Sequence, residues 1–202
     1  ARGGFLDGSN LGIDTSNASG TFTYGGVIAD TNAGANSIGL EKLGSGTLEL
    51  TAVSTYSGAT TVSGGTLLVN NNNGSGSGVV SGDLNVENGV VALAAATNGM
   101  LTVAGNLDVS AGGTLQLQLG GATLNDSASI RGDESSLNSL NPAIISGWES
   151  ANTQSLHDHI LSNDAVSPVI DGVVQINLNG YTPVYGDVFD LLDWANLSNS
   201  IS

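Results

Sequence analysis

Two groups of side chains in the last third of the chain have the types and spacing of metal ligands. One is His157-Asp158-His159, where both histidines of the chain flank an acid, and the other is Asp187, Asp190 and Asp193. Two histidines at alternate positions of a β-strand point the same way and can chelate a metal. Carboxylates at a three-residue spacing offer oxygen ligands to Ca²⁺.

The local pattern argues against a histidine site. Apolar residues at positions 156, 160 and 161 have the spacing of a short helix, which we predict over residues 152–162 with Asn152 or Thr153 as its N-cap. On such a helix the two histidines diverge by about 200°. The aspartate group lacks the glycine-rich nonapeptide of Ca²⁺-binding solenoids, so we interpret it as a solvated acidic face. We predict no cofactor and no metal centre, and these two groups are the candidates if Ca²⁺ or another metal binds.

Catalytic residues are scarce along the chain. Parallel β-helices that cleave polysaccharides need clustered acids with an arginine or lysine near the scissile bond. The body of this chain offers only Lys42 and Arg131, far apart, and its repeats carry Thr, Ser and Asn rather than carboxylates. We therefore predict no catalytic residues, and a polysaccharide-degrading enzyme is the second alternative function.

A sequence repeat predicts the β-strands that position these side chains. A phrase of alternating apolar residues around a central glycine occurs at residues 61–69, 85–93 and 108–117. Its matched valines, 24 and 23 residues apart, are Val62, Val86 and Val109. Strand-like alternation with glycine corners at this period predicts an all-β parallel solenoid, in which each coil returns the chain one strand spacing higher.

Charge and composition limit the partners. The chain has 3 Lys and Arg against 18 Asp and Glu, a formal net charge of −15. A surface so poor in cations offers no face for phosphates, which excludes nucleic acid and anionic membranes. No run of apolar residues is long enough to be inserted in a membrane as a helix. Cysteine is absent. Because the chain begins without an initiator Met, we expect a processed product or a piece of a longer protein.

Three regions are expected along the chain. Residues 1–130 form parallel β-helix coils, residues 131–165 form an insertion with the short helix, and residues 166–202 form closing β coils. Four aromatic residues gather near the end of a chain that has few of them: Tyr181, Tyr185, Phe189 and Trp194. We predict that they cap the last coil, whose apolar core and strand edges would otherwise be exposed.

Residues 40–69 resemble a known repeat. Lys42 is followed by a Gly-x-Gly-Thr-Leu strand at 44–50, a Ser-Thr-Tyr-x-Gly turn at 54–58, and a Thr-x-Val strand with its own Gly-Thr-Leu at 60–69. This pattern is similar to the autotransporter-associated β-strand repeat, or passenger-associated repeat. Residues 180–194 are similar to closing segments of exported repeat proteins of Verrucomicrobia and Planctomycetes. The resemblance implies a bacterial, right-handed parallel β-helix that is exported and is secreted, extracellular or held at the cell surface.

The leading hypothesis is a non-catalytic extracellular structural protein that self-assembles as a cell-surface, sheath or fibre subunit. Parallel coils leave unpaired backbone groups at both ends, and copies of the chain can match them end to end or pack laterally. The coils over residues 20–130 give about 24 Å of height, which is short for a stand-alone stalk. The first alternative is an adhesive or carbohydrate-binding passenger, with surface polysaccharide as its partner.

Overall fold

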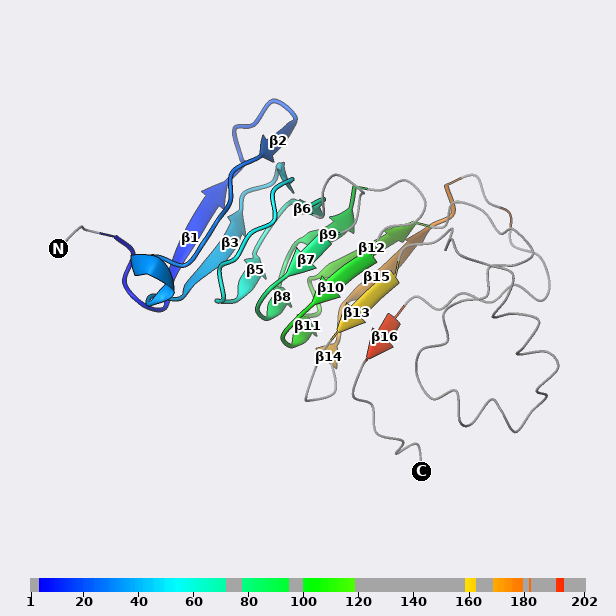
Figure 1. Ribbon diagram of the computed structural model, residues 1–202. Coiled ribbons are helices and arrows are strands. Elements are labelled where there is room, and N and C mark those ends of the chain that lie inside the picture. The colour runs from blue at the N-terminus through cyan, green and yellow to red at the C-terminus, as the bar shows by residue number, and fades with distance from the viewer. Residues whose placement is uncertain are drawn as a thin grey trace, which may run out of the picture.

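The computed structural model describes residues 4–71, 78–94, 100–118, 159–162, 169–179, 182 and 192–194. All pairs of named strands in it run parallel, and neighbouring strands of a sheet come from successive coils. Figure 1 shows the strands stacked from β1 (Ser9–Asp14) at one end to β16 (Leu192–Trp194) at the other. The parallel β-solenoid predicted from the repeat is confirmed.

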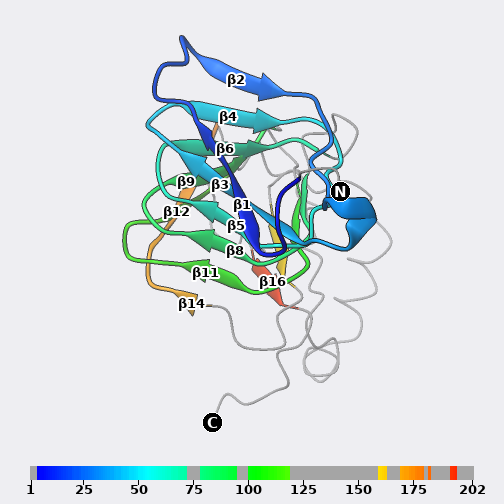
Figure 2. The same ribbon diagram turned by 90° about the vertical axis from the view of Figure 1, so that its left-hand side faces the viewer.

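Three sheets form the sides of the solenoid, and the view in Figure 2 looks onto its N-terminal end. Sheet A contains β1, β3 (Ile38–Leu43), β5 (Thr60–Val62), β8 (Leu84–Val86), β11 (Leu107–Val109) and β14 (Val169–Ile170). Sheet B contains β2 (Thr21–Tyr24), β4 (Thr47–Leu50), β6 (Thr66–Val69), β9 (Val90–Leu93), β12 (Thr114–Gln118) and β15 (Val173–Asn177). Sheet C contains β7 (Gly78–Val80), β10 (Met100–Val103), β13 (His159–Ser162) and β16.

One full coil contributes a strand to sheet C, then one to sheet A and then one to sheet B. The strands β7, β8 and β9 form one coil, and β10, β11 and β12 form the next. In the earlier coils, extended segments occupy the side of sheet C, and a parallel bridge between Ala29 and Thr55 joins two of them. A 3-10 turn at Asn32–Gly34 follows the first segment. Three sides therefore surround one continuous hydrophobic core.

Columns of residues that stack from coil to coil build this core. One column of sheet B consists of Phe22, Leu48, Leu67, Val91, Leu115 and Val174. The repeat valines Val62, Val86 and Val109 stack directly in a column of sheet A, and all three are 0 % exposed. Full burial of such a side chain contributes about 1.5–3 kcal/mol relative to leaving it exposed. The sequence period is thus the length of one coil.

Glycine occupies the corner before each strand of sheet B. These residues are Gly20, Gly46, Gly65, Gly89, Gly113 and Gly172. A Cβ built on Gly113 would contact the Val86 carbonyl oxygen, and one built on Gly172 would contact the Gly113 carbonyl oxygen. The backbones of successive corners approach too closely for a side chain. This close approach explains why Gly-Thr-Leu recurs at 46–48, 65–67 and 113–115.

The helix predicted over residues 152–162 is wrong where the structure describes it. His159–Ser162 form β13, which pairs with β10 on one edge and β16 on the other. Pairing on both edges satisfies the backbone groups that a helix would satisfy internally, so the tertiary context overrides the local apolar spacing.

Other parts of the C-terminal prediction lie outside the described residues. Residues 152–158 are among them, as are Tyr181, Tyr185 and Phe189 of the predicted aromatic cap. Sheets A and B resume at β14 and β15, although the expected boundaries of the three regions stay predictions.

Candidate binding surfaces and a buried lysine

Lys42 is the one lysine or arginine among the described residues, and it lies inside the solenoid. Its side chain is 0 % exposed, because the alternation along β3 turns Lys42 inward and Glu41 outward. The ammonium donates hydrogen bonds to three backbone carbonyls, at 2.8 Å to Leu43 O, 2.9 Å to Gly44 O and 3.0 Å to Gly64 O. Each of the three N–H donors of the ammonium therefore has an acceptor.

These carbonyls belong to two consecutive coils. Leu43 and Gly44 lie where the chain leaves β3, and Gly64 lies where it leaves β5. Burial lowers the pKa of Lys42, and the Asp14 carboxylate partly offsets this effect. The lysine therefore links two coils from within and presents no charge to a partner outside.

The outward face of sheet A is acidic, which corrects the expectation that the repeats carry Thr, Ser and Asn rather than carboxylates. The strands of this sheet carry Asp14, Glu41 and Asp108, and three more carboxylates lie directly beside the ends of its strands, those of Asp83, Glu87 and Asp171. Glu41 accepts a hydrogen bond from Ser63 Oγ at 3.0 Å, and Asp83 accepts one from the Asn106 N–H at 2.8 Å. Since the one described lysine is buried, no exposed lysine or arginine in the described residues balances these charges. This face therefore repels anions and a second copy of itself.

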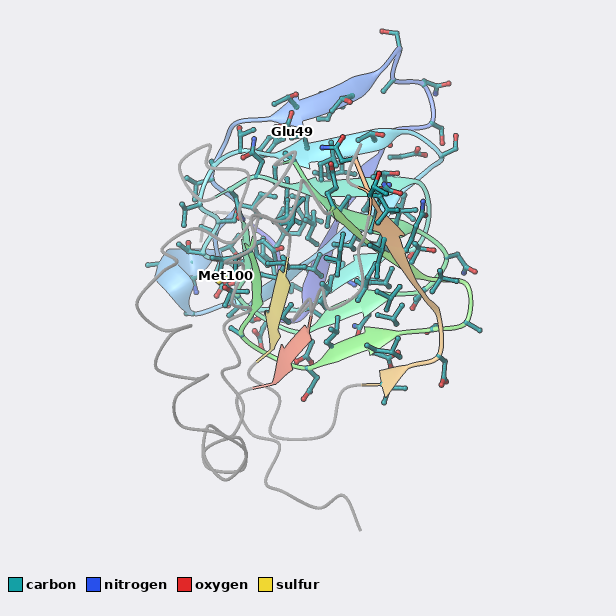
Figure 3. The ribbon with its side chains drawn as sticks, turned by 90° about the vertical axis from the view of Figure 1, so that its right-hand side faces the viewer. Glu49 and Met100 are labelled. Atoms are coloured by element: carbon teal, nitrogen blue, oxygen red, sulfur yellow. The ribbon has the colours of Figure 1, made fainter. Side chains whose placement is uncertain are left out.

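The outward face of sheet B is almost uncharged. One of its columns holds a β-branched residue in each coil: Thr21, Thr47, Thr66, Val90, Thr114 and Val173. Glu49 is the one acid within the six strands of this sheet. It accepts hydrogen bonds from Thr23 Oγ1 at 2.9 Å and from the Asn70 side-chain amide at 3.0 Å. Figure 3 labels Glu49 beside the N-terminal strands of sheet B and Met100, which belongs to sheet C.

The N-terminal end of the solenoid, which faces the viewer in Figure 2, exposes core positions. β1 and β2 are terminal strands of sheets A and B, so one edge of each faces no described strand. Phe22 is 46 % exposed, whereas Leu48, the next residue of the same column, is 0 % exposed. Phe5 and Leu6 are also exposed near this end. Strand edges beside apolar side chains are the features of a surface that accepts another coil.

The residues predicted as metal ligands are only partly described. His159 and Asp193 lie in β13 and β16, which pair with each other. His157, Asp187 and Asp190 lie outside the described residues, as does Arg131. Across the part of the chain that the structure describes, no three His, Asp or Glu side chains gather as a metal site. The same residues include no helix long and apolar enough to cross a membrane. Metal binding stays a prediction for the candidate residues.

A comparison with protein families identifies the segment that contains Lys42. The family model of the passenger-associated-transport-repeat matches residues 40–69. Residues 40–69 carry a passenger-associated-transport-repeat. The resemblance found for these residues in the sequence is thereby confirmed, whereas the likeness of residues 180–194 to exported repeat proteins stays a prediction. In the structure this repeat contributes β3 and β5 to sheet A and β4 and β6 to sheet B, and it contains the buried lysine with all of its acceptors.

A second comparison extends the likeness beyond the repeat itself. The adhesin BmaC autotransporter of Brucella suis biovar 1 (strain 1330) is 37% identical to this chain over 129 residues, which is 61% of the chain. The chain spans 3% of the length of that relative. No solved structure matches the chain.

Proposed function

We propose that this chain is a non-catalytic, extracellular solenoid of passenger type whose role is structural, and that it assembles end to end with copies of itself. The passenger-associated repeat and the similarity to an autotransporter adhesin support the extracellular, passenger-type part of this proposal. The same two likenesses support a role without catalysis.

One observation carries the assembly part of the proposal, and it is the exposed core column at the N-terminal end. Phe22 leaves 46 % of its surface exposed at a position that is fully buried one coil later. A further coil laid on β1 and β2 would bury this ring and pair both strand edges. Parallel strands of the same spacing fit this edge, and where a second copy supplies them the head-to-tail contact propagates into a filament.

Sedimentation velocity and negative-stain microscopy of the chain at up to about 1 mM test this assembly. We expect concentration-dependent association and filaments, both lost in Phe22→Asp because a carboxylate would be buried in the contact. Thr61→Asp is the matched control, since it adds the same charge to the outward face of sheet A, in the third strand from that end of the sheet. A monodisperse monomer at the highest concentration would contradict the assembly, as would filaments that Phe22→Asp leaves intact.

Adhesion to a carbohydrate is the second candidate function, and the similarity to an adhesin favours it. The outward face of sheet B offers hydroxyl and amide groups with one carboxylate, which suits a neutral polysaccharide better than the acidic face of sheet A does. A glycan array probed with the monomer tests this candidate. Binding that Thr66→Arg abolishes and Thr61→Arg on sheet A preserves would support it, and an array without bound glycans would contradict it.

A further inference from the structure

A row of valines lies on the outside of the sheet C side. Three residues on this side point inward, namely Ile28, Ser54 and Val80, at 3, 6 and 2 % exposure. The residue directly before each of them points outward, in accord with the alternation of extended chain. We call these outward residues the valine row, and they are Val27, Val53 and Val79, at 59, 49 and 37 % exposure.

Contacts between neighbouring segments place the valine row in consecutive coils. The Ile28 N–H donates to Ser54 Oγ at 3.2 Å, and Ala29 pairs with Thr55 in a parallel bridge. Ser81 Oγ donates to the Ser54 carbonyl at 3.5 Å, which joins the third segment to the second. Each valine of the row lies 26 residues after the one before it. They therefore form a ladder with a rise of about 4.8 Å per coil.

The described outward residues directly beside the valine row are uncharged. Ala29, Thr55 and Ser81 are the next outward residues, and Thr102 of β10 lies in register with Val79. The nearest carboxylate in these segments, that of Asp30, accepts hydrogen bonds from the Ser57 hydroxyl and backbone N–H at 2.7 and 3.0 Å. A strip of exposed apolar side chains is thus present on a chain with a net charge of −15.

We propose that the valine row is a lateral contact between two copies of this chain. The inference rests on the proposed structural function and adds a second surface to the end-on contact. A ladder of valines repeating at the strand spacing fits best against another ladder of the same spacing, because the side chains then interdigitate along its whole length. A second copy of the solenoid supplies that spacing, whereas a globular partner does not.

The distribution of charge also favours a second copy of the chain as the partner and the valine row as the contact surface. Two copies that meet through sheet A would bring together carboxylates such as Glu41 and Asp108 without a cation between them. The valines themselves carry no charge, so a contact through the valine row brings fewer carboxylates together, and it removes exposed apolar area from water. A two-fold axis through Val53 would place it against Val53 of the second copy, and Val27 against Val79 of the second copy.

The size of the strip predicts a weak contact. Three coils of about 4.8 Å and a width of about four extended residues give a strip of roughly 14 by 13 Å. Its area is well below the about 1,000 Å² that a stable interface buries. The contact is therefore expected at the roughly millimolar effective concentrations of molecules held side by side, and it adds strength to an array already joined at its ends.

A single introduced thiol tests the contact directly, because the chain has no cysteine. The Val53→Cys variant at about 1 mM is treated with a short bis-maleimide that spans the roughly 10 Å between packed sheets. We expect a covalent dimer, formed much faster than with Thr61→Cys on the outward face of sheet A. Equal cross-linking of the two variants, or none in either, would overturn the lateral contact. Protection of the Val53→Cys thiol from a monofunctional maleimide in dilute monomer would also overturn it, since another part of the chain would then cover the row.

Aspartate substitutions at different surfaces distinguish the lateral contact from the end-on assembly of the proposed function. Val53→Asp should weaken lateral association by about tenfold or more, because it buries an ionised carboxylate in an apolar contact. Thr61→Asp adds the same charge to sheet A. It should weaken lateral association only by the small amount that follows from the added net charge. If Phe22→Asp abolishes filaments while Val53→Asp leaves their lateral bundling unchanged, the valine row is refuted and the end-on assembly stands. If neither filaments nor cross-linked dimers form in the unsubstituted or thiol-bearing chain, both proposals fail.

Discussion

Replacement of Lys42 by methionine tests whether the buried ammonium stabilises the coils. Methionine has a similar length and suits the apolar column of Ile13 and Val62, but it donates no hydrogen bond. The Leu43 carbonyl keeps the Thr15 N–H as a donor at 3.1 Å, whereas the carbonyls of Gly44 and Gly64 lose the lysine.

The expected cost of Lys42→Met follows from these two carbonyls. A fully buried acceptor left without its donor costs about 1–3 kcal/mol, and Gly44 and Gly64 are half-buried, so the cost at each lies near the lower end of that range. Two of them cost about 2–3 kcal/mol, and release of the lysine from its desolvated site offsets part of this. We therefore expect the free energy of unfolding to fall by about 1–2 kcal/mol.

Urea unfolding followed by far-ultraviolet circular dichroism measures this change. Glu41→Gln is the matched control, because its side chain is the outward neighbour and accepts one hydrogen bond from Ser63 Oγ. We expect that control to change stability by less than about 1 kcal/mol. A Lys42→Met variant as stable as the unsubstituted chain, or more stable, would refute the reasoning, because desolvation of the charge would then outweigh its three hydrogen bonds.

Three further outcomes are expected. Gly113→Ala should destabilise the fold by about 1–3 kcal/mol, because its Cβ meets the Val86 backbone, whereas Gly20→Ala should be nearly neutral in the same thermal unfolding assay, since nothing lies within 4 Å of its Cβ. Hydrogen bonds from the Ser57 hydroxyl and from backbone N–H groups hold the pKa of Asp30 below 3.8, so its contribution to stability should be complete above that pH and vanish as the pH falls through the lowered pKa. The unfolding midpoint of Asp30→Asn, measured against pH, should therefore converge with that of the unsubstituted chain in acid. Burial raises the pKa of Tyr56 above 10.0, so stability should fall as the pH rises through the raised value, and absorbance near 295 nm should show its phenolate only together with unfolding.

The sequence predicts the coils well because each coil repeats the same physical requirements. Corner glycines such as Gly65 and Gly113 are fixed by the close approach of backbones, and the inward alternation after them is fixed by the core. The spacing of the repeat valines therefore gives the register of sheet A directly, since Val86 stacks on both of its matched neighbours. The same alternation places Lys42 on the inward side of β3, and that was the available signal for its burial.

Features that depend on distant partners are not accessible in this way. β13 has the local spacing of a helix, yet it pairs with β10 across a separation of 59 residues, as Met100 pairs with His159. The acceptors of Lys42 are backbone carbonyls, which carry no residue type that a pattern could reveal. The valine row is not predictable from the sequence for a third reason. Its valines recur every 26 residues in segments whose other residues do not repeat.

The burial of the lysine also determines where copies of the solenoid can meet. With Lys42 inside, no exposed lysine or arginine of the described residues offsets the carboxylates, so approach through sheet A is repulsive and weakens as salt screens it. Contacts must then use surfaces whose attraction does not depend on opposite charges. The end at Phe22 supplies strand edges and an exposed ring, and the valine row supplies an apolar ladder. Since screening reduces only the repulsion between copies, association through these two surfaces should become stronger as ionic strength rises, whereas a contact built from ion pairs would become weaker.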